Sequence, residues 1–172
     1  MSTELPQRQH LHLGKGRVTI VCATYNETYT DALLQNCIDE LEAIAPAVRV
    51  TVHRVPGAFE VPLMVKRSIC APGMAEELRP DAVIALGVIL RGSTAHADLI
   101  GSSITNQLMA IGCETMVPVI HEVLLLNDEQ QAFARCIASS LNRGREAARA
   151  AAAMMDLIAT TTPRTPRPTQ AH

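Results

Sequence analysis

The chain has 172 residues, of which 48% are hydrophobic, and its formal net charge at pH 7 is −2. This length and composition predict one globular domain with a substantial apolar core. The sequence has no basic stripe, and its aromatic residues are limited to two tyrosines and two phenylalanines, which argues against a nucleic-acid partner.

The composition also bears on the compartment. No uninterrupted apolar segment approaches the ~18 residues that a membrane span needs, and the N-terminus lacks the basic and apolar stretches of a secretory signal. The five cysteines, at positions 22, 37, 70, 113 and 136, show no CxxC spacing, and four of them lie in apolar patterns. We therefore expect reduced cysteines, no membrane partner and a cytoplasmic location.

The two ends of the chain differ in composition from its middle. Residues 1–15 contain two histidines and a proline and predict an irregular N-terminal arm. Residues 160–172 are rich in threonine, proline and arginine and predict a disordered C-terminal tail. The expected domain therefore spans residues 16–159.

Within this domain, short apolar segments alternate with segments of helical periodicity, which is typical of βαβ units. The first helix is expected at 28–44, where Thr28 and Asp31 resemble a capping box, and the third at 95–111, where Gly112 provides a stop. The sequence thus predicts an α/β fold with a parallel sheet. The expected strands are 18–23, 48–55, 82–89 and 116–121, and the remaining helices begin near residues 59, 128 and 145.

Unusual side chains are concentrated immediately after the expected strands. They occupy residues 24–26, 56–60, 90–96 and 121–122. In parallel α/β sheets, ligands bind outside the carboxyl ends of the strands. We therefore expect these four turns to converge on one ligand site.

The turn Gly92-Ser93-Thr94 and the histidine after it are the clearest candidate for chemistry. The turn precedes an expected helix, whose N-terminal N–H groups and dipole suit a phosphate. His96 would lie on the first helical turn, where its imidazole could pass a proton in either direction near neutral pH. His96 and Asp98 diverge around a helix and have no further clustered ligands, so we expect no metal.

Three further side chains allow both a structural and a functional interpretation. Tyr25 could stack on a flat heterocycle, or it could form a half-buried rim. Glu60 could accept hydrogen bonds from ligand hydroxyls, or it could only complement a helix dipole, which is worth roughly 0.3–1 kcal/mol. Arg135 could be a solvated helix residue, or it could bind a phosphate in a bidentate manner.

With these residues assembled, the chain resembles the lumazine synthase family over about residues 16–158. The resemblance implies a three-layer α/β/α sandwich with a four-stranded parallel, flavodoxin-like sheet. Its most specific segments are Val55-Pro-Gly-Ala-Phe-Glu-Val-Pro62 and Ala85-Leu-Gly-Val-Ile-Leu-Arg-Gly-Ser-Thr-Ala-His96, supported by Pro118-Val-Ile120, by Gln131-Ala132 with Arg135, and by Arg143-Gly144-Arg-Glu-Ala-Ala148.

The resemblance also implies an activity in riboflavin biosynthesis. Members of this family condense 5-amino-6-(D-ribitylamino)uracil with 3,4-dihydroxy-2-butanone 4-phosphate, and they release phosphate and water without a metal or an organic cofactor. By resemblance, His96 transfers protons, and Gly92, Ser93, Thr94 and Arg135 hold the phosphate. The residues expected to contact the pyrimidine and its ribityl chain are Tyr25, Asn26, Gly57, Ala58, Glu60, Val88, Ile89, Leu90, His121 and Arg143.

The family forms homo-oligomers built from pentamers, with each active site shared between adjacent subunits. By resemblance, His121, Arg135 and Arg143 reach the pocket of the neighbouring subunit. The sequence leaves open whether the chain forms a pentamer, a pair of pentamers or a shell of sixty subunits.

Four positions depart from the common family pattern. Tyr25 stands where phenylalanine or tryptophan is frequent, and His121 and Ala97 replace aromatic residues. Arg143 replaces a frequent lysine and keeps the charge with altered geometry. A non-catalytic homologue that binds riboflavin or lumazine is the alternative function, but the phosphate turn with His96 favours the enzyme.

Overall fold

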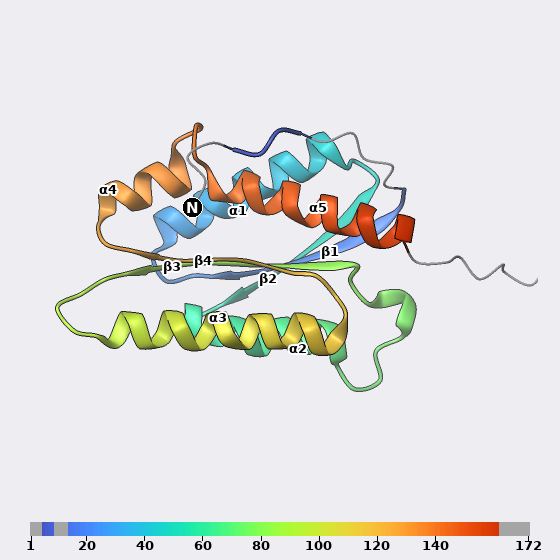
Figure 1. The fold of residues 1–172 in the computed structure, drawn as a ribbon, viewed down its shortest axis with the longest axis horizontal. Coiled ribbons are helices and arrows are strands. Elements are labelled where there is room, and N and C mark those ends of the chain that lie inside the picture. Colours follow the sequence, from blue (N-terminus) through green and yellow to red (C-terminus); the bar gives the residue numbers. More distant parts are fainter. Residues whose placement is uncertain (1–4, 9–13, 162–172) are drawn as a thin grey trace, which may run out of the picture.

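The computed structural model describes residues 5–8 and 14–161. Four parallel strands form a central sheet in the order β2-β1-β3-β4, with helices on both faces (Figure 1). This order is the flavodoxin-like one, and the predicted three-layer α/β/α sandwich is confirmed. The strands are β1 (Gly16–Ala23), β2 (Val48–Val55), β3 (Ala82–Leu90) and β4 (Val119–Leu126). The helices are α1 (Glu27–Ile44), η1 (Ala58–Glu60), α2 (Val61–Cys70), η2 (Glu76–Leu78), α3 (His96–Thr115), α4 (Glu129–Ala132), η3 (Phe133–Ile137) and α5 (Arg143–Thr161).

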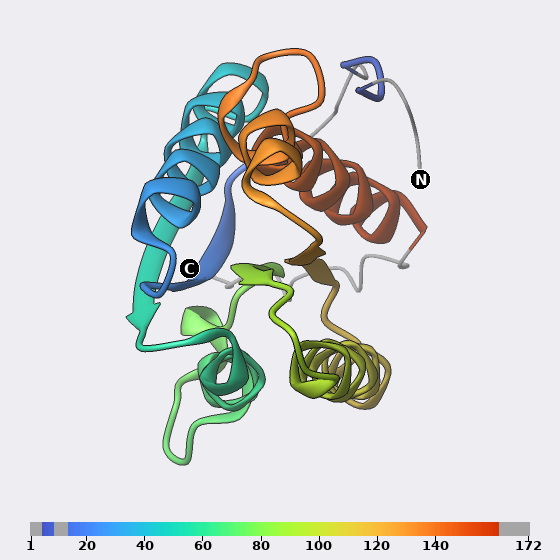
Figure 2. The same cartoon turned by 90° about the vertical axis from the view of Figure 1, so that its left-hand side faces the viewer.

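The sheet separates two helical layers. Helices α1, α4 and α5 cover one face, which we call the α1/α5 layer, and α2 and α3 cover the other, the α2/α3 layer (Figure 2). Successive side chains of a strand point to opposite faces, so each strand contributes to both cores. On β1, Val18, Ile20 and Cys22 belong to the core of the α1/α5 layer, whereas Val21 and Ala23 belong to that of the α2/α3 layer.

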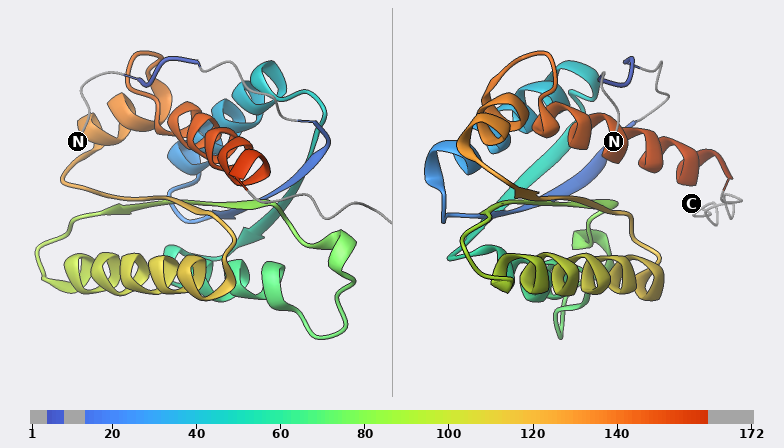
Figure 3. Two further views of the ribbon diagram at one scale, coloured as in Figure 1. Left: turned by 45° about the vertical axis from the view of Figure 1, so that its right-hand side comes forward. Right: turned by 60° about the vertical axis from the view of Figure 1, so that its left-hand side comes forward.

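Helix α5 packs against α1 over much of its length (Figure 3). Small side chains of α5, those of Ala147, Ala148 and Ala151, have no exposed surface and belong to the core of the α1/α5 layer. The two helices come very close at Gly144, where a Cβ atom would lie 2.2 Å from the carbonyl oxygen of Leu33. The alanine-rich C-terminal segment therefore forms part of the core of its own chain.

The α1/α5 layer contains a buried ion-pair network centred on Glu40, which is 4% exposed. The Glu40 carboxylate accepts hydrogen bonds of 2.9 Å from Nε and Nη2 of Arg8 and of 2.7 Å from Nε of Arg149. Arg149 also donates to the carbonyl oxygen of Pro6. The hydrogen bond from Arg8, followed by that from Arg149, lowers the pKa of Glu40 to about 2. Residues 5–8 are thereby held against α1 and α5.

The fourth strand differs from its prediction, which placed it at 116–121. β4 pairs with β3 from Val119 to Leu126, after Met116 has ended α3 in the left-handed conformation with φ 57°. His121 and Glu122 were interpreted as the polar end of the strand, but they lie inside it. An edge strand tolerates such residues because its side chains remain partly exposed.

The helix ends also correct the sequence predictions. Helix α1 begins at Glu27, and its N-cap is Asn26, so the proposed capping box of Thr28 and Asp31 is wrong. Asp31 instead pairs with Arg54, at 2.6 Å. Helix α3 continues through Gly112 to Thr115, because the left-handed residue that ends it comes later than the glycine.

Parts of the predicted arm and tail lie outside the described residues. These are residues 1–4 and 9–13 of the arm and residues 162–172 of the tail. Helix α5 extends over Arg143–Thr161, which is longer at both ends than its prediction. Across residues 5–8 and 14–161, no helix combines the length and the apolar character that crossing a membrane requires.

The five cysteines are free and fall into two groups. Cys22, Cys37 and Cys136 are buried in the core of the α1/α5 layer, whereas Cys70 on α2 and Cys113 on α3 are exposed. Burial raises the pKa of Cys22 to about 11 and that of Cys136 to about 12. The three buried thiols are therefore protonated and unreactive near neutral pH.

Candidate active site

A cavity of about 520 Å³ opens at the carboxyl ends of β1, β2 and β3. Three segments surround it: the turn before α1, the turn that contains η1, and the loop before α3. The predicted site residues that line this cavity are Tyr25, Asn26, Gly57, Ala58, Glu60, Val88, Ile89, Leu90, Gly92, Thr94 and His96.

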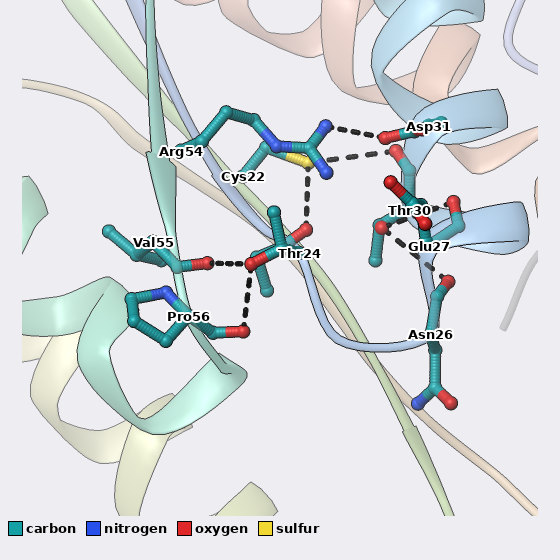
Figure 4. A network of polar contacts seen from close by, with 10 residues as sticks. Cys22, Thr24, Asn26, Glu27, Thr30, Asp31, Arg54, Val55 and Pro56 are labelled. Carbon is teal, nitrogen blue, oxygen red and sulfur yellow. Dashed lines mark hydrogen bonds and ion pairs between the residues drawn. The ribbon is translucent and has the colours of Figure 1, made fainter.

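The turns that follow β1 and β2 are tied together by hydrogen bonds (Figure 4). The Thr24 hydroxyl group donates hydrogen bonds to the carbonyl oxygen of Val55, at 2.8 Å, and to that of Pro56, at 3.0 Å. The backbone N–H of Thr24 donates to Val55, and that of Tyr25 donates to Pro56, at 2.8 and 3.0 Å. This network holds Tyr25 beside the turn that starts with Gly57.

Asn26 links the turn after β1 to the end of β3. Its backbone is left-handed, with φ 61° and ψ 46°, a conformation that asparagine adopts more readily than most residues. Its Nδ2 donates a 2.8 Å hydrogen bond to the carbonyl oxygen of Val88. The preceding residue, Tyr25, is 74% exposed, so the interpretation of its ring as a half-buried rim is wrong. The ring is open to a ligand in the cavity.

Glu60 stabilises the turn in which it lies. Its Oε2 accepts a 3.0 Å hydrogen bond from the backbone N–H of Gly57, across the single turn of η1. The carboxylate therefore does more than complement the dipole of α2. Because Glu60 is exposed and lines the cavity, it remains accessible to ligand hydroxyl groups.

His96 lies on the first turn of α3, as predicted, where it is the first helical residue, and its side chain is exposed. Gly92 and Thr94 line the same cavity, whereas Ser93, the third residue of the predicted phosphate turn, is exposed and not part of the lining. The N-terminal N–H groups of α3 have no intrahelical acceptors and favour an anion. The imidazole and an anion-favouring helix end therefore share one cavity.

Arg91 was not among the predicted site residues, although it fixes the loop before α3. Its Nη1 lies 2.5 Å from Oδ1 of Asn127, and its Nη2 forms an ion pair with Asp98. The hydrogen bond from Arg91 lowers the pKa of Asp98, which is therefore anionic near neutral pH. In the described ranges, no group of three or more His, Cys, Asp or Glu side chains has an arrangement that could hold a metal ion.

Three other cavity residues were missing from the predicted contacts. Phe59 is 60% exposed and lies between the predicted residues Ala58 and Glu60. Ala97 and Ile100 come from the first turns of α3. The spacing of four residues between His96 and Ile100 places both on one side of the helix, a signal that could have identified Ile100.

His121 does not line this cavity. Its Nδ1 accepts a 3.1 Å hydrogen bond from the N–H of Val123, and its Nε2 lies 2.8 Å from Oγ1 of Thr105. A neutral ring whose Nδ1 accepts carries its hydrogen on Nε2, which donates to Thr105. Burial lowers the pKa of His121 and favours this neutral form. The ring lines a separate apolar groove of about 560 Å³ beside α3, β4 and the end of α5.

Arg135 and Arg143 also lie away from the cavity, in the α1/α5 layer. Arg135 belongs to η3, a π-helical turn, and its Nη1 is buried without a hydrogen-bond partner among the described residues. The interpretation of Arg135 as a solvated helix residue is therefore wrong. Arg143 begins α5, is 5% exposed and forms an ion pair with Glu146.

Sequence comparisons place these features in a known family. The family model described as 6,7-dimethyl-8-ribityllumazine synthase matches residues 15–159. A protein of that name from Thermococcus gammatolerans is 40% identical over 85% of this chain and 90% of its own length. Those from Protochlamydia amoebophila and Edwardsiella ictaluri are 37% and 36% identical, over 86% and 84% of this chain and 83% and 90% of their own lengths. The chain therefore belongs to the lumazine synthase family.

Proposed function

We propose that the chain condenses 5-amino-6-(D-ribitylamino)uracil with 3,4-dihydroxy-2-butanone 4-phosphate to give 6,7-dimethyl-8-ribityllumazine in riboflavin biosynthesis, releasing phosphate and water. The observation that carries this proposal is the cavity at the carboxyl edge of the sheet, where an exposed tyrosine, an imidazole and a helix N-terminus meet. The alternative of a non-catalytic binding protein gains no support, because the relatives described above are named as synthases.

We assign the two substrates to adjacent parts of the cavity. The exposed ring of Tyr25 would stack on the pyrimidine, with Asn26 beside it, and the turn from Gly57 through Ala58 to Glu60 would hold the ribityl chain. The phosphate would lie at the N-terminal end of α3. There it would contact Gly92, Ser93 and Thr94, while the backbone groups of Val88, Ile89 and Leu90 would contact the polar edge of the ring.

Catalysis would depend mainly on proximity and orientation. An amine and a ketone held in register react without strong acid–base assistance. Schiff-base formation, phosphate elimination and ring closure each move protons, and His96 is the titratable imidazole in the cavity. We therefore assign proton transfer to His96 and expect it to accelerate the reaction without being indispensable.

We further propose that the chain assembles into a homo-oligomer built from pentamers in the cytoplasm. His121 and Arg135 of the adjacent subunit would complete each cavity, and Arg143 would contribute its charge. The apolar groove beside α3, with exposed Met109 and Met116 along it, supports an interface there. The buried, unpartnered Nη1 of Arg135 supports an anion-binding role for that side chain.

The first experiment mixes the purified chain with both substrates and follows the absorbance of the lumazine product. We expect turnover, and His96→Ala should lower kcat by about 10-fold to 100-fold, at or below the usual range for a general acid–base group. His53→Ala, on β2, is the matched control and should leave kcat unchanged. Absence of turnover, together with quenching of riboflavin fluorescence, would instead identify a binding protein.

The second experiment tests the shared site. Arg135→Ala should chiefly raise the KM for the phosphate substrate, because the anion loses a cationic partner while the reacting groups stay in place. Arg67→Ala removes the same charge from an exposed position on α2 and should have no effect. Light scattering of the purified chain would distinguish five, ten and sixty subunits, and a stable active monomer would contradict the shared site.

A further inference from the structure

Asp98 is a carboxylate in the first turn of α3 that the proposed reaction does not use. It is the third helical residue, so it lies on the same turn as His96, beside the helix end proposed to bind the phosphate. A carboxylate at this position of a helix usually complements the N-terminal N–H groups and the positive end of the dipole. If it were unpaired, it would therefore compete with an anionic substrate for the start of α3.

The carboxylate of Asp98 is paired outside the cavity. Its Oδ1 accepts a hydrogen bond from Nη2 of Arg91, in an ion pair. Neither of these two residues lines the cavity, whereas His96, Ala97 and Ile100 of the same helix do. Within residues 5–8 and 14–161, the backbone N–H groups of residues 96–98 have no acceptor, that of Asp98 included. The start of α3 is therefore left open for an anion.

Arg91 is held in place by groups other than Asp98. Its backbone N–H donates a 2.9 Å hydrogen bond to the carbonyl oxygen of Leu126, the last residue of β4. Its Nη1 donates to Oδ1 of Asn127, at 2.5 Å. The backbone N–H of Asn127 donates in turn to Oε1 of Gln131 on α4, at 3.0 Å. The guanidinium group therefore keeps these partners whether or not residue 98 carries a charge.

The ion pair cancels the charge of Asp98 close to the start of α3. The side chains of Arg91 and Asp98 are 43% and 51% exposed, so the pair adds little to the free energy of unfolding. An unpaired carboxylate on the first helical turn would nevertheless repel each negative charge of a phosphate bound there. The pair therefore matters more for anion binding than for folding.

We infer that Arg91 is a positioning residue for the phosphate substrate, which holds the carboxylate of Asp98 outside the cavity and cancels its charge so that the start of α3 accepts an anion. This inference rests on the proposed function, which places the phosphate at the turn of residues 92–94. Arg91 acts through Asp98, since it does not line the cavity itself. Removal of both charges should therefore restore the anion binding that is lost when Arg91 alone is replaced.

The test is calorimetric titration of the purified protein, in the assembly that it forms, with inorganic phosphate near neutral pH. Arg91→Gln leaves the carboxylate of Asp98 unpaired and should weaken phosphate binding by about tenfold, the scale of repulsion between like charges at an exposed site. Asp98→Asn removes the carboxylate and should bind phosphate at least as tightly as wild type. The double variant that carries both substitutions should bind phosphate nearly as tightly as wild type.

A purely structural role for Arg91 predicts a different pattern. If Arg91 only anchored the loop before α3, Asp98→Asn would weaken phosphate binding as Arg91→Gln does, and the double variant would not recover. With both substrates, Arg91→Gln should raise the KM for the phosphate substrate and leave kcat and the KM for the pyrimidine substrate nearly unchanged. A distorted loop would change all three constants.

Lys66→Gln is the matched control. It removes the cation from an exposed ion pair with Glu114, at 3.1 Å, near the other end of α3. The net charge of the chain changes as it does in Arg91→Gln, but the start of the helix is left intact. Lys66→Gln should therefore bind phosphate as wild type does.

The outcomes separate failure of the inference from failure of the proposed function. If Arg135→Ala weakens phosphate binding and Arg91→Gln does not, the role of Arg91 is refuted and the phosphate site stands. If the wild-type chain binds phosphate but does not turn over both substrates, the proposed reaction fails, and the titrations still decide the role of Arg91. If the wild-type chain binds no phosphate, both fail.

Thermal unfolding of each variant shows whether it is folded. If Arg91→Gln does not fold, Asp98→Asn decides alone, because it keeps the partners of Arg91 on β4 and in the loop after it. Weaker phosphate binding by Asp98→Asn then refutes the inference, and equal or tighter binding supports it.

Discussion

The two helical layers on either side of the sheet differ in what they bury. In the α2/α3 layer the core is apolar, and the buried polar residues Thr19 and Ser68 are uncharged hydroxyl groups. The α1/α5 layer buries the carboxylate of Glu40 and the guanidinium group of Arg143, and it partly buries Glu122. Charges are retained in such surroundings only where opposite charges and hydrogen bonds compensate their desolvation.

The two layers should therefore respond differently to pH. Helices α2 and α3 place Glu60 and His96 at the cavity through apolar packing, which is insensitive to pH. The α1/α5 layer holds Arg135 and Arg143 among groups that titrate, so its stability and its charge depend on pH. Substitutions in the two layers should test this contrast.

The largest effect is expected from Gly144→Ala in the α1/α5 layer. The new Cβ would lie 2.2 Å from the carbonyl oxygen of Leu33, a backbone atom that cannot rotate away, so α5 must shift from α1. We expect the free energy of unfolding in urea to fall by at least about 3 kcal/mol.

Gly101→Ala on α3 is the matched control in the other layer. Its Cβ would meet only the side chain of Leu125, at 3.4 Å, and alanine has the higher helix propensity. The control should change stability by less than about 1 kcal/mol. Equal losses for Gly144→Ala and Gly101→Ala would remove the distinction between the two layers.

Glu40→Gln should cost about 2–3 kcal/mol of stability near neutral pH, by conversion of the lowered pKa. The pKa of Glu40 is about 2 in the folded chain, below its ordinary value of 4.5. The stabilisation by the ionised carboxylate is therefore present above about pH 4.5, and it is lost as the pH falls toward 2. Urea unfolding at several pH values should show the difference from wild type shrinking on acidification. Glu42→Gln, exposed on the same helix, should show no such trend.

Glu122→Gln should have the opposite pH dependence. The pKa of Glu122 is raised to about 7, so its ionisation opposes folding, and wild-type stability falls as the pH rises from about 4.5 through 7. We expect the variant to match wild type in mild acid and to be more stable by about 1–2 kcal/mol at pH 8, after allowance for partial exposure. Parallel stability curves for the two chains would contradict a raised pKa.

The smallest effect is expected at the edge between the layers, for Asn26→Ala. The variant loses the 2.8 Å hydrogen bond to Val88 and places alanine in the left-handed conformation, for a total of about 1–2 kcal/mol. Asn26→Gly removes the hydrogen bond but accepts the backbone conformation. A loss for Asn26→Gly equal to that of Asn26→Ala would show that the hydrogen bond alone matters.

The fold and most of the cavity could be predicted because their signals are local. Alternating apolar periods identified the strands and helices, and the rule that ligands bind at the carboxyl ends of parallel strands selected the turns around Tyr25, Gly57 and Thr94. Asn26 and Glu60, which the sequence also selected, line the cavity, and the hydrogen bonds that each makes to the backbone depend on the folded turn.

The features that the sequence did not reveal depend on long-range packing. His121 and Glu122 resemble the polar end of a strand, and only the pairing with β3 shows that β4 continues beyond them. The surroundings of Arg135 depend on how η3 packs against α1, which no local period encodes. The ion pair between Arg91 and Asp98 likewise forms only when the loop before α3 closes on the helix.

Because the cysteines fall into a buried and an exposed group, their reactivity with alkylating reagents can report on assembly of the chain. Alkylating reagents should modify Cys70 and Cys113 and spare the three protonated thiols in the core. Cys113 lines the apolar groove beside α3, whereas Cys70 lies outside it, at the end of α2. A neighbouring subunit seated on that groove would shield Cys113 and leave Cys70 as an internal standard, so that mass spectrometry after brief labelling would measure occupancy of the groove.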